Sequence, residues 1–390
     1  MTIEQKLSNY MANQLDEFYE LLQKVVQLES PTEGGREDLK ICRDFFSTLF
    51  EKLGFRSEVI KNEDKRFGDH LHLTLGEGEE QLLFVGHYDT VYEKGSFGSL
   101  WKSDENKIWG PGVLDMKGGN IQVYFVVKAL QDLELLPDNK KIVFLLSADE
   151  EAGSPTSHEL FKKEAKKSKA AFVMEPTMGD CTGGLTIGRF SRGNYTFIAE
   201  GQSAHSGQHP EKAESALKEL AQQVQYLESL TDLEKGITIA CTCLTSGNAG
   251  WPTVPGEGEL TIDARFFNDE LAEKFDAQFQ KLTPFNPHIN ITTQGGIEKP
   301  SFEPDQPGNK KLFEIAQEMG RKFDMEMEGY IGRAGTDGNF TSSAGCPTLD
   351  GMGMSGNYLH QPGKEYMNVD DVIPRGAFVA RMVIEVFQNM

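Results

Sequence analysis

The sequence predicts an α/β fold, in which a domain with a mostly parallel sheet is interrupted by a smaller α+β domain. With 390 residues, the chain is long enough for two domains that each have a core. Apolar runs alternate with helical segments in its first and last parts, which is typical of α/β proteins. Residues 190–299 instead follow the order strand, helix, strand, strand, helix, strand, which predicts a split βαβ (ferredoxin-like) arrangement with an antiparallel sheet. We therefore assign residues 1–189 and 300–390 to the larger domain and residues 190–299 to an insertion.

The N-terminal part is predicted to begin with two helices and two strands. Apolar periodicity places the helices at residues 3–29 and 36–53 and the strands at residues 55–60 and 70–75. His70 and His72 lie on one face of the second strand. We interpret them as exposed histidines of an edge strand, because no acidic residue follows them at strand-end spacing.

Three longer apolar runs each end in ionisable side chains. They are residues 81–86 followed by His87 and Asp89, residues 142–146 followed by Glu150 and Glu151, and residues 170–174 followed by Glu175. Such runs are typical of strands buried on both faces. Buried carboxylates need partners, and ligands of open α/β sheets bind outside the carboxyl ends of the strands. We therefore expect these side chains to converge at one edge of the parallel sheet.

Asp115 lies in a glycine-rich loop, directly before a helix predicted at residues 120–136. One interpretation is an acidic residue that stabilises the N-terminus of the helix through the helix dipole. The density of glycine favours a tighter arrangement, in which the backbone lies against a ligand.

The insertion and the C-terminal part complete the order of elements. In the insertion, strands are expected at residues 192–200, 236–244, 258–267 and 288–293, and helices at 211–230 and 269–282. After it, helices at 309–323 and 369–387 flank a Gly/Ser-rich stretch at 329–360. Cys241 and Cys243 alternate along one strand of the insertion, so both should face the same side of it.

Charge and cysteine content narrow the classes of function. The chain has 60 acidic residues against 39 lysines and arginines, a net charge of −21, which disfavours nucleic acid and anionic membranes as partners. An anionic substrate would therefore need arginines placed at its binding site. The five cysteines are an odd number without CxxC spacing, which favours reduced thiols. Because the sequence shows no signal-peptide pattern and no apolar run of about 18–20 residues, we predict a cytoplasmic protein.

Six side chains from separate parts of the sequence form the candidate site: His87, Asp115, Glu150, Glu151, Glu175 and His360. Two histidines with three or four carboxylates make a nitrogen and oxygen ligand set without thiolate. Such a set suits a pair of divalent ions such as Zn²⁺, about 3.5–4 Å apart when one carboxylate bridges them. The sequence therefore predicts a dinuclear metal site.

Short motifs occur along almost the whole chain. Those in the larger domain are GHYDTV at residues 86–91, WGPG at 109–112, DMKGG at 115–119, DEEAGS at 149–154, EP at 175–176, GTDGNF at 335–340 and LH at 359–360. Those in the insertion are RG at 192–193, GQSAHSG at 201–207 and DAR at 263–265. In kind and in order they resemble the motifs of the dinuclear zinc exopeptidase and deacetylase family, which includes glutamate carboxypeptidase, acetylornithine deacetylase and succinyl-diaminopimelate desuccinylase. The glutamate carboxypeptidase type is the most similar.

The resemblance implies a cofactor of two Zn²⁺ ions, which Co²⁺ could replace, and a role for each residue of the site. The implied ligands are Asp115 as the bridge, His87 and Glu175 at one ion, and Glu151 and His360 at the other. Asp89 would hold the ring of His87. Glu150 would be the general base that takes a proton from the attacking water and returns it to the leaving amine. The peptide bond between Asp115 and Met116 would be cis.

The resemblance also points to residues of the insertion, which would act as a lid and dimerisation domain. His205 resembles the histidine that, in dimeric members, stabilises the tetrahedral oxyanion in the site of the other subunit. Arg265 resembles the arginine that binds the carboxylate of the substrate. Arg333 is a second candidate, for which pairing with a local acid is an equal alternative. One departure is Pro252-Thr253, where the family usually has Asn-Val, and this change leaves the substrate contact across the dimer open.

These observations favour a hydrolase that cleaves an amide bond next to a free carboxylate, as a glutamate-type carboxypeptidase does. Its substrate would be a small molecule or a short peptide, and the open edge strand of the inserted sheet predicts a homodimer. The first alternative is an N-acyl amino acid deacylase, which recognises the other side of the amide. A non-catalytic metal-binding homologue is disfavoured because neither the base nor a ligand has been lost. A dinucleotide-binding oxidoreductase would need a GxGxxG motif in the first βαβ unit, and the sequence has none there.

Overall fold

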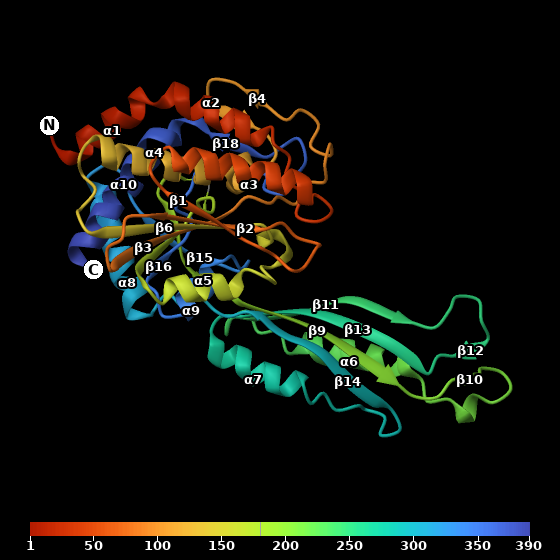
Figure 1. Cartoon of the computed structure of the whole chain (residues 1–390). Coiled ribbons are helices and arrows are strands. Elements are labelled where there is room, and N and C mark those ends of the chain that lie inside the picture. The colour runs from red at the N-terminus through yellow and green to blue at the C-terminus, as the bar shows by residue number, and fades with distance from the viewer. Residues whose placement is uncertain (180) are drawn as a thin grey trace. The chain divides into compact units, whose positions relative to one another are not determined.

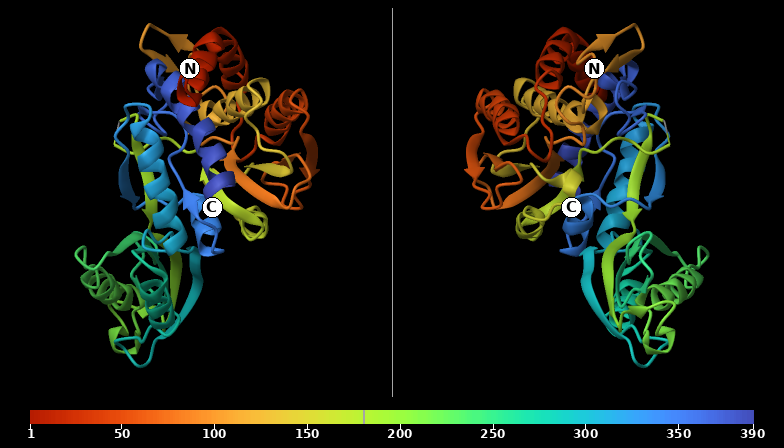
Figure 2. Two further views of the ribbon diagram at one scale, coloured as in Figure 1. Left: turned by 90° about the vertical axis from the view of Figure 1, so that its left-hand side faces the viewer. Right: turned by 90° about the vertical axis from the view of Figure 1, so that its right-hand side faces the viewer.

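A computed structural model describes residues 1–179 and 181–390, and this part of the chain forms two compact units (Figure 1). The larger unit comprises Met1–Gly188, Pro304–Gly332 and Thr336–Met390. The smaller unit comprises Arg189–Glu303 together with Arg333–Gly335, whereas the insertion was expected at residues 190–299. Both chain termini lie in the larger unit (Figure 2).

The larger unit is built on a six-stranded sheet with the order β1-β2-β6-β3-β7-β16. Its strands are β1 (Arg56–Ile60), β2 (His70–Leu75), β3 (Glu80–His87), β6 (Lys140–Ser147), β7 (Ser168–Val173) and β16 (Thr348–Leu349). The three strands expected to share an edge are neighbours, because β3 pairs in parallel with both β6 and β7.

Two smaller sheets complete the strands of this unit. One contains β17 (Gly356–Asn357), β18 (Tyr366–Asn368), β5 (Lys107–Trp109) and β4 (Lys102–Ser103), in that order. The other pairs β15 (Glu328–Gly332) with β8 (Gly184–Arg189). The first of them joins the segment before the predicted Asp115 loop to the segment that follows His360.

Helices cover both faces of the six-stranded sheet, which explains why its central strands are almost continuously apolar (Figure 1). The helices are α1 (Ile3–Asn13), α2 (Leu15–Val26), α3 (Arg36–Glu51), α4 (Gly118–Asp132), α5 (His158–Ala165), α8 (Pro307–Arg321), α9 (Gly338–Ser343) and α10 (Val372–Asn389). Leu82 and Phe84 of β3 belong to the large core formed with α1 to α4, α8 and α10. Leu83 and Val85 face the other way, into a core with Phe161 of α5. The predicted α/β class is confirmed.

Two expectations for the N-terminal part are wrong. The segment at residues 3–29 forms two helices instead of one, since Gln14 leaves the helical conformation and α1 packs on α10 while α2 packs on α4. The strand with the two histidines is not at an edge, because β2 pairs with β1 and with β6. His70 is only 2% exposed, and its burial lowers the pKa of the imidazole. Its Nδ1 accepts a hydrogen bond from the Ala148 N–H at 3.3 Å.

The smaller unit has the predicted split βαβ topology. Its elements are β9 (Ser191–Glu200), α6 (Ala216–Ser229), β11 (Ile237–Ser246), β13 (Glu257–Phe266), α7 (Asp269–Phe279) and β14 (Asn290–Lys299), with β10 (Ala204–His205) paired to β12 (Thr253–Val254). The four long strands form an antiparallel sheet with the order β11-β13-β9-β14. Burial alternates along β9, because one face of the sheet packs on the two helices.

The expectation that Cys241 and Cys243 face one side of a regular strand is wrong. The register of β11 against β13 shifts between these two residues, as at a β-bulge. Cys241 is half-buried against the core of the unit, and Cys243 is exposed. Among the helices described for residues 1–179 and 181–390, none combines the length and apolar character needed to cross a membrane.

Candidate metal centre

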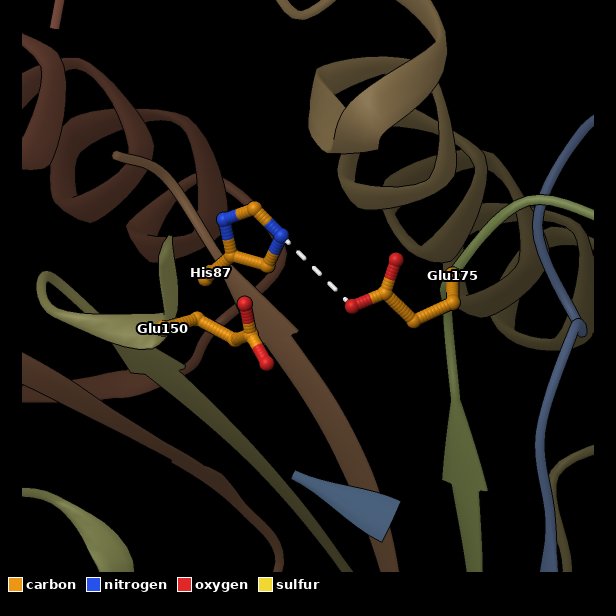
Figure 3. A group of neighbouring side chains, drawn as sticks. All are labelled: His87, Glu150 and Glu175. Atoms are coloured by element: carbon orange, nitrogen blue, oxygen red, sulfur yellow. Dashed lines mark ion pairs between the residues drawn. The ribbon is translucent and has the colours of Figure 1, made fainter. Parts of the chain in front are cut away.

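The carboxyl ends of β3, β6 and β7 bring together the ionisable side chains that follow them in sequence. His87 is the last residue of β3, Glu150 lies in the turn after β6, and Glu175 follows β7. Figure 3 shows the carboxylates of Glu150 and Glu175 pointing toward the ring of His87. Single ligand atoms of the three residues lie within 4.8 Å of one another, and so do single atoms of His87, Asp115 and Glu151. The structure thus places these predicted site residues in one buried cluster.

Asp115 lies at the middle of this cluster. Its Oδ1 is 3.1 Å from Nε2 of His87, and its Oδ2 is 3.2 Å from Nε2 of His360. Each imidazole therefore faces a different oxygen of one carboxylate, which is the arrangement that a bridging carboxylate needs. The peptide bond between Asp115 and Met116 is cis, as expected.

A glutamate lies beyond each histidine. Oε1 of Glu175 is 3.6 Å from Nε2 of His87, and Oε2 of Glu151 is 3.5 Å from Nε2 of His360. The cluster therefore divides into two groups of one histidine and one glutamate, which share Asp115 between them. This nitrogen and oxygen donor set fits two borderline divalent ions.

Glycine allows the Asp115 segment to lie close to the end of β7. A Cβ atom on Gly119, at the start of α4, would be 2.2 Å from the carbonyl oxygen of Met174. Gly112, three residues before Asp115, has a φ of 71°, which L side chains rarely adopt. These contacts agree with a loop whose backbone is held tightly against a site. They agree less well with the alternative, in which Asp115 only stabilises the N-terminus of a helix.

Burial and crowding of negative charge shift the pKa values of the cluster. Burial and the neighbouring Asp115 carboxylate raise the pKa of Glu175 to about 8 and that of Glu151 well above its ordinary value. Burial opposes a charge on His87, but the carboxylates of Asp115, Asp89 and Glu175 outweigh it and raise the pKa of the imidazole. The cluster is thus short of positive charge, which bound divalent cations would supply.

The turn that carries Glu150 and Glu151 is held by two buried carboxylates. Asp149 accepts hydrogen bonds from the Thr156 N–H at 2.7 Å and from the Ser157 hydroxyl at 2.6 Å. Asp89 accepts from the Glu151 N–H at 3.2 Å through Oδ2. Oδ1 of Asp89 is 3.4 Å from Nδ1 of His87, and the carbonyl oxygen of Asp89 is 3.0 Å from the same nitrogen. Asp89 therefore contacts both the ring of His87 and the backbone of the glutamate turn.

Three further predicted site residues lie in the smaller unit. His205 is exposed, and its Nδ1 accepts from the N–H groups of Gly207 and Gln208, each at 3.1 Å. Because Nδ1 is an acceptor, the neutral ring carries its proton on Nε2 and can donate there. Arg265 makes a two-pronged ion pair with Asp263, at 2.6 and 3.0 Å.

Arg333 has a different environment within the same unit. Its Nη1 donates to the Thr238 hydroxyl at 3.0 Å, and its guanidinium lies 5.1 Å from the centre of the Phe190 ring. In the part of the chain that the structure describes, the guanidinium of Arg333 thus contacts a hydroxyl and a ring instead of a local acid.

The sequence interpretation missed Glu365 and Asp337, two buried carboxylates of the larger unit. Glu365 is fully buried and accepts from the N–H of Asp115 at 3.2 Å. Asp337 accepts from the hydroxyls of Ser147 and Ser154, on either side of the glutamate turn. Neither residue follows a long apolar strand. The signals available were the GTDGNF motif for Asp337 and a spacing of five residues from His360 for Glu365.

Comparison with known proteins shows the family of the chain. Residues 83–385 match peptidase family M20/M25/M40, and the chain belongs to this family. It is 29% identical over 379 residues to carboxypeptidase G2 from Pseudomonas sp. (strain RS-16), a match that covers 93% of this chain and 87% of that protein. It is 30% identical over 257 residues to succinyl-diaminopimelate desuccinylase from Rickettsia canadensis (strain McKiel), which covers 59% of this chain and 64% of that protein.

Solved structures show the same fold. Aminopeptidase PepT from Bacillus cereus ATCC 10987 matches with a TM-score of 0.77 at 19% identity, covering 96% of this chain and 99% of that one. The fold, the buried nitrogen and oxygen ligand set and the family together define a metal-dependent hydrolase.

Proposed function

We propose that the protein is a zinc-dependent hydrolase that cleaves an amide bond next to a free carboxylate and releases a C-terminal amino acid. The observation that carries this proposal is the buried Asp115 carboxylate, whose two oxygens face the buried His87 and the exposed His360. The match to carboxypeptidase G2 over 93% of this chain supports the carboxypeptidase reaction.

In this proposal Asp115 would be shared by two Zn²⁺ ions, which Co²⁺ could replace. His87 and Glu175 would hold one ion, and Glu151 and His360 would hold the other. Bound there, the ions would supply a Lewis acid that polarises the amide carbonyl and lowers the pKa of water. Asp89 fixes the ring of His87 through Nδ1, which leaves Nε2 to face Asp115.

Glu150 is the proposed general base. It is 9% exposed and lies beside His87 and Glu175, at the start of a turn fixed by Asp149. In this position its carboxylate would take a proton from the attacking water and return it to the leaving amine. The same position would also suit a metal ligand, so metal content and turnover must be measured separately on a Glu150 variant.

The smaller unit is proposed to complete the site as a lid and dimerisation domain of a cytoplasmic homodimer. The sheet of this unit has β11 and β14 at its edges, where a second copy could pair. The Nε2–H of His205 would donate to the oxyanion in the site of the other subunit. If sedimentation at assay concentration shows only monomers and these are fully active, His205 does not act in the site of another subunit.

An arginine of the smaller unit is proposed to bind the carboxylate of the substrate. We favour Arg333 as this residue, because the fork of Arg265 is already paired with Asp263. The guanidinium of Arg333 has its remaining donors available for a planar, two-pronged contact with a carboxylate.

The second candidate function is an N-acyl amino acid deacylase. The match to succinyl-diaminopimelate desuccinylase favours it, since that relative is named for removal of an acyl group. Parallel assays on N-acylated glutamate, N-acetylated amino acids and dipeptides decide between the two. The carboxypeptidase proposal expects the highest kcat/KM on substrates with a C-terminal glutamate or a similar residue, and a preference set only by the acyl group would contradict it.

Dependence on metal is tested on the same substrates. Dialysis against a chelator should abolish activity, and Zn²⁺ or Co²⁺ should restore it. Full activity of protein shown to contain less than one ion per chain would contradict the proposed chemistry.

A further inference from the structure

Glu365 is a buried acid that none of the proposed catalytic roles uses. It lies directly before β18 and is fully buried. Its Oε1 accepts two hydrogen bonds, from the N–H of Leu114 at 2.9 Å and from the N–H of Asp115 at 3.2 Å. Its Oε2 accepts from the hydroxyl of Tyr92 at 2.5 Å. The carboxylate thus binds the backbone of the residue at the middle of the candidate metal centre.

Burying a further carboxylate next to a cluster of acids costs free energy, which its hydrogen bonds must offset. Tyr92 lies five residues after His87, and Glu365 lies five residues after His360. The carboxylate therefore connects the three segments that present His87, Asp115 and His360. If Glu365 were removed, the buried N–H groups of Leu114 and Asp115 would lose this hydrogen-bond acceptor.

We propose that Glu365, together with Tyr92, is a positioning residue of the candidate metal centre. It fixes the backbone at Asp115 so that the carboxylate of Asp115 stands between the two histidines. Glu365 does not act as a further ligand in this arrangement, because both of its oxygens are engaged by donors of the protein. The inference rests on the proposed function for the existence of the metal centre, but it concerns metal binding and not the choice of substrate.

The test compares metal binding by the full-length protein and by four variants. Glu365→Leu removes both acceptor oxygens, and Tyr92→Phe removes one donor and leaves the carboxylate in place. Glu365→Gln keeps an oxygen for the two N–H groups, and its amide can donate to the hydroxyl of Tyr92. The matched control is Glu219→Leu in the smaller unit, where the Glu219 carboxylate accepts from the N–H groups of Phe285 and Asn286, each at 2.9 Å.

Metal-free protein is titrated with Zn²⁺ under a competing chelator, and the absorption spectrum of Co²⁺-loaded protein reports the geometry of the ligands. We expect Glu365→Leu to lower the affinity for the ions about 10- to 100-fold and to change the Co²⁺ spectrum. Tyr92→Phe should lower the affinity about two- to tenfold, the effect of one hydrogen bond. Glu365→Gln and Glu219→Leu should bind both ions with the affinity and the spectrum of the wild type.

The inference is overturned if Glu365→Leu loses thermal stability while its metal affinity and Co²⁺ spectrum stay those of the wild type. Should Glu365→Leu not fold, Tyr92→Phe decides, and unchanged affinity and spectrum in that variant would overturn the inference. Wild-type protein that binds no ions would overturn both this inference and the proposed function. Wild-type protein that binds two ions but cleaves none of the proposed substrates would contradict only the function.

Discussion

Most predicted site residues of the larger unit differ from those of the smaller unit in how the protein holds them. His87, Asp115 and Glu175 are between 1% and 8% exposed and lie at or near the end of a buried element, whereas the side chain of His360 is 51% exposed. His205 is exposed, and Arg333 contacts a hydroxyl and an aromatic ring near the surface. Buried groups with several fixed partners cannot move without a cost, whereas exposed groups can. We therefore expect variants of the larger unit to remove activity and variants of the smaller unit to reduce it.

The largest effect on metal binding is expected for Glu151→Gln. The change removes the charge of a proposed ligand. The affinity for the ion near His360 should fall by more than the ~10- to 100-fold that is typical for a residue that only supports a ligand. The ion near His87 should remain bound. Metal analysis after gel filtration measures this, and two tightly bound ions in the variant would show that Glu151 is not a ligand.

Among variants of the smaller unit, the largest effect on turnover is expected for His205→Ala. If the Nε2–H of His205 donates to the oxyanion, its removal should lower kcat about 10²- to 10³-fold with little change in KM. Metal content should stay that of the wild type. Mixing this variant with Glu150→Gln would recover part of the activity if the two residues act across a dimer. A kcat equal to that of the wild type would remove His205 from the mechanism.

A smaller and more selective effect is expected for Arg333→Ala. Loss of a charged hydrogen-bond partner for the substrate carboxylate should raise KM about 10- to 100-fold. For substrates whose carboxylate is replaced by an amide, the KM of Arg333→Ala should equal that of the wild type. Arg265→Ala is the comparison, since Arg265 is already paired with Asp263. If Arg265→Ala raises KM more than Arg333→Ala does, the assignment between the two arginines is reversed.

The smallest effect expected is a pH dependence of stability in the metal-free protein. Glu175 has a pKa of about 8 in the folded protein, above the ordinary value, so the folded state holds its proton more tightly than the unfolded state does. Stability should therefore fall as the pH rises from about 5 to 8. His87 acts in the same direction, because its raised pKa contributes stability that is lost as pH rises. The lowered pKa of Asp115 contributes stability that is lost only at lower pH, as that carboxylate becomes protonated.

Thermal unfolding in the presence of a chelator measures this pH dependence. The Tm of metal-free protein should decrease across this range, and saturating Zn²⁺ should remove most of the decrease. A Tm that rises with pH in the chelator would contradict the assigned shifts.

The sequence predicted the larger unit well where burial determines the structure. The apolar runs before His87, Glu150 and Glu175 could be recognised as buried strands, and parallel pairing then brings their ends together. His360 lies in a loop that no periodicity marks, and the resemblance to a known family was needed to give it a role as a metal ligand. The role of β2 was misjudged because pairing with both β1 and β6 depends on contacts distant in sequence.

Other features of the structure could not be read from local sequence. Glu365 reaches the backbone of Asp115 across 250 positions of the chain, so its role depends on tertiary contacts alone. The bulge between Cys241 and Cys243 is a shift in pairing register, which alternation of residue types does not show. Asp263 and Arg265 pair within one strand, but the contact of Arg333 with Thr238 joins positions 95 residues apart and depends on the tertiary structure.

The central claim is that two adjacent glutamates in one turn have different functions, with Glu151 as a metal ligand and Glu150 as the base. Metal content and turnover of purified Glu150→Gln test it most directly. We predict two ions per chain and a kcat that is lower by about 10²- to 10⁴-fold, the typical contribution of a general base. Normal turnover, or the loss of an ion together with the activity, would contradict this division of roles.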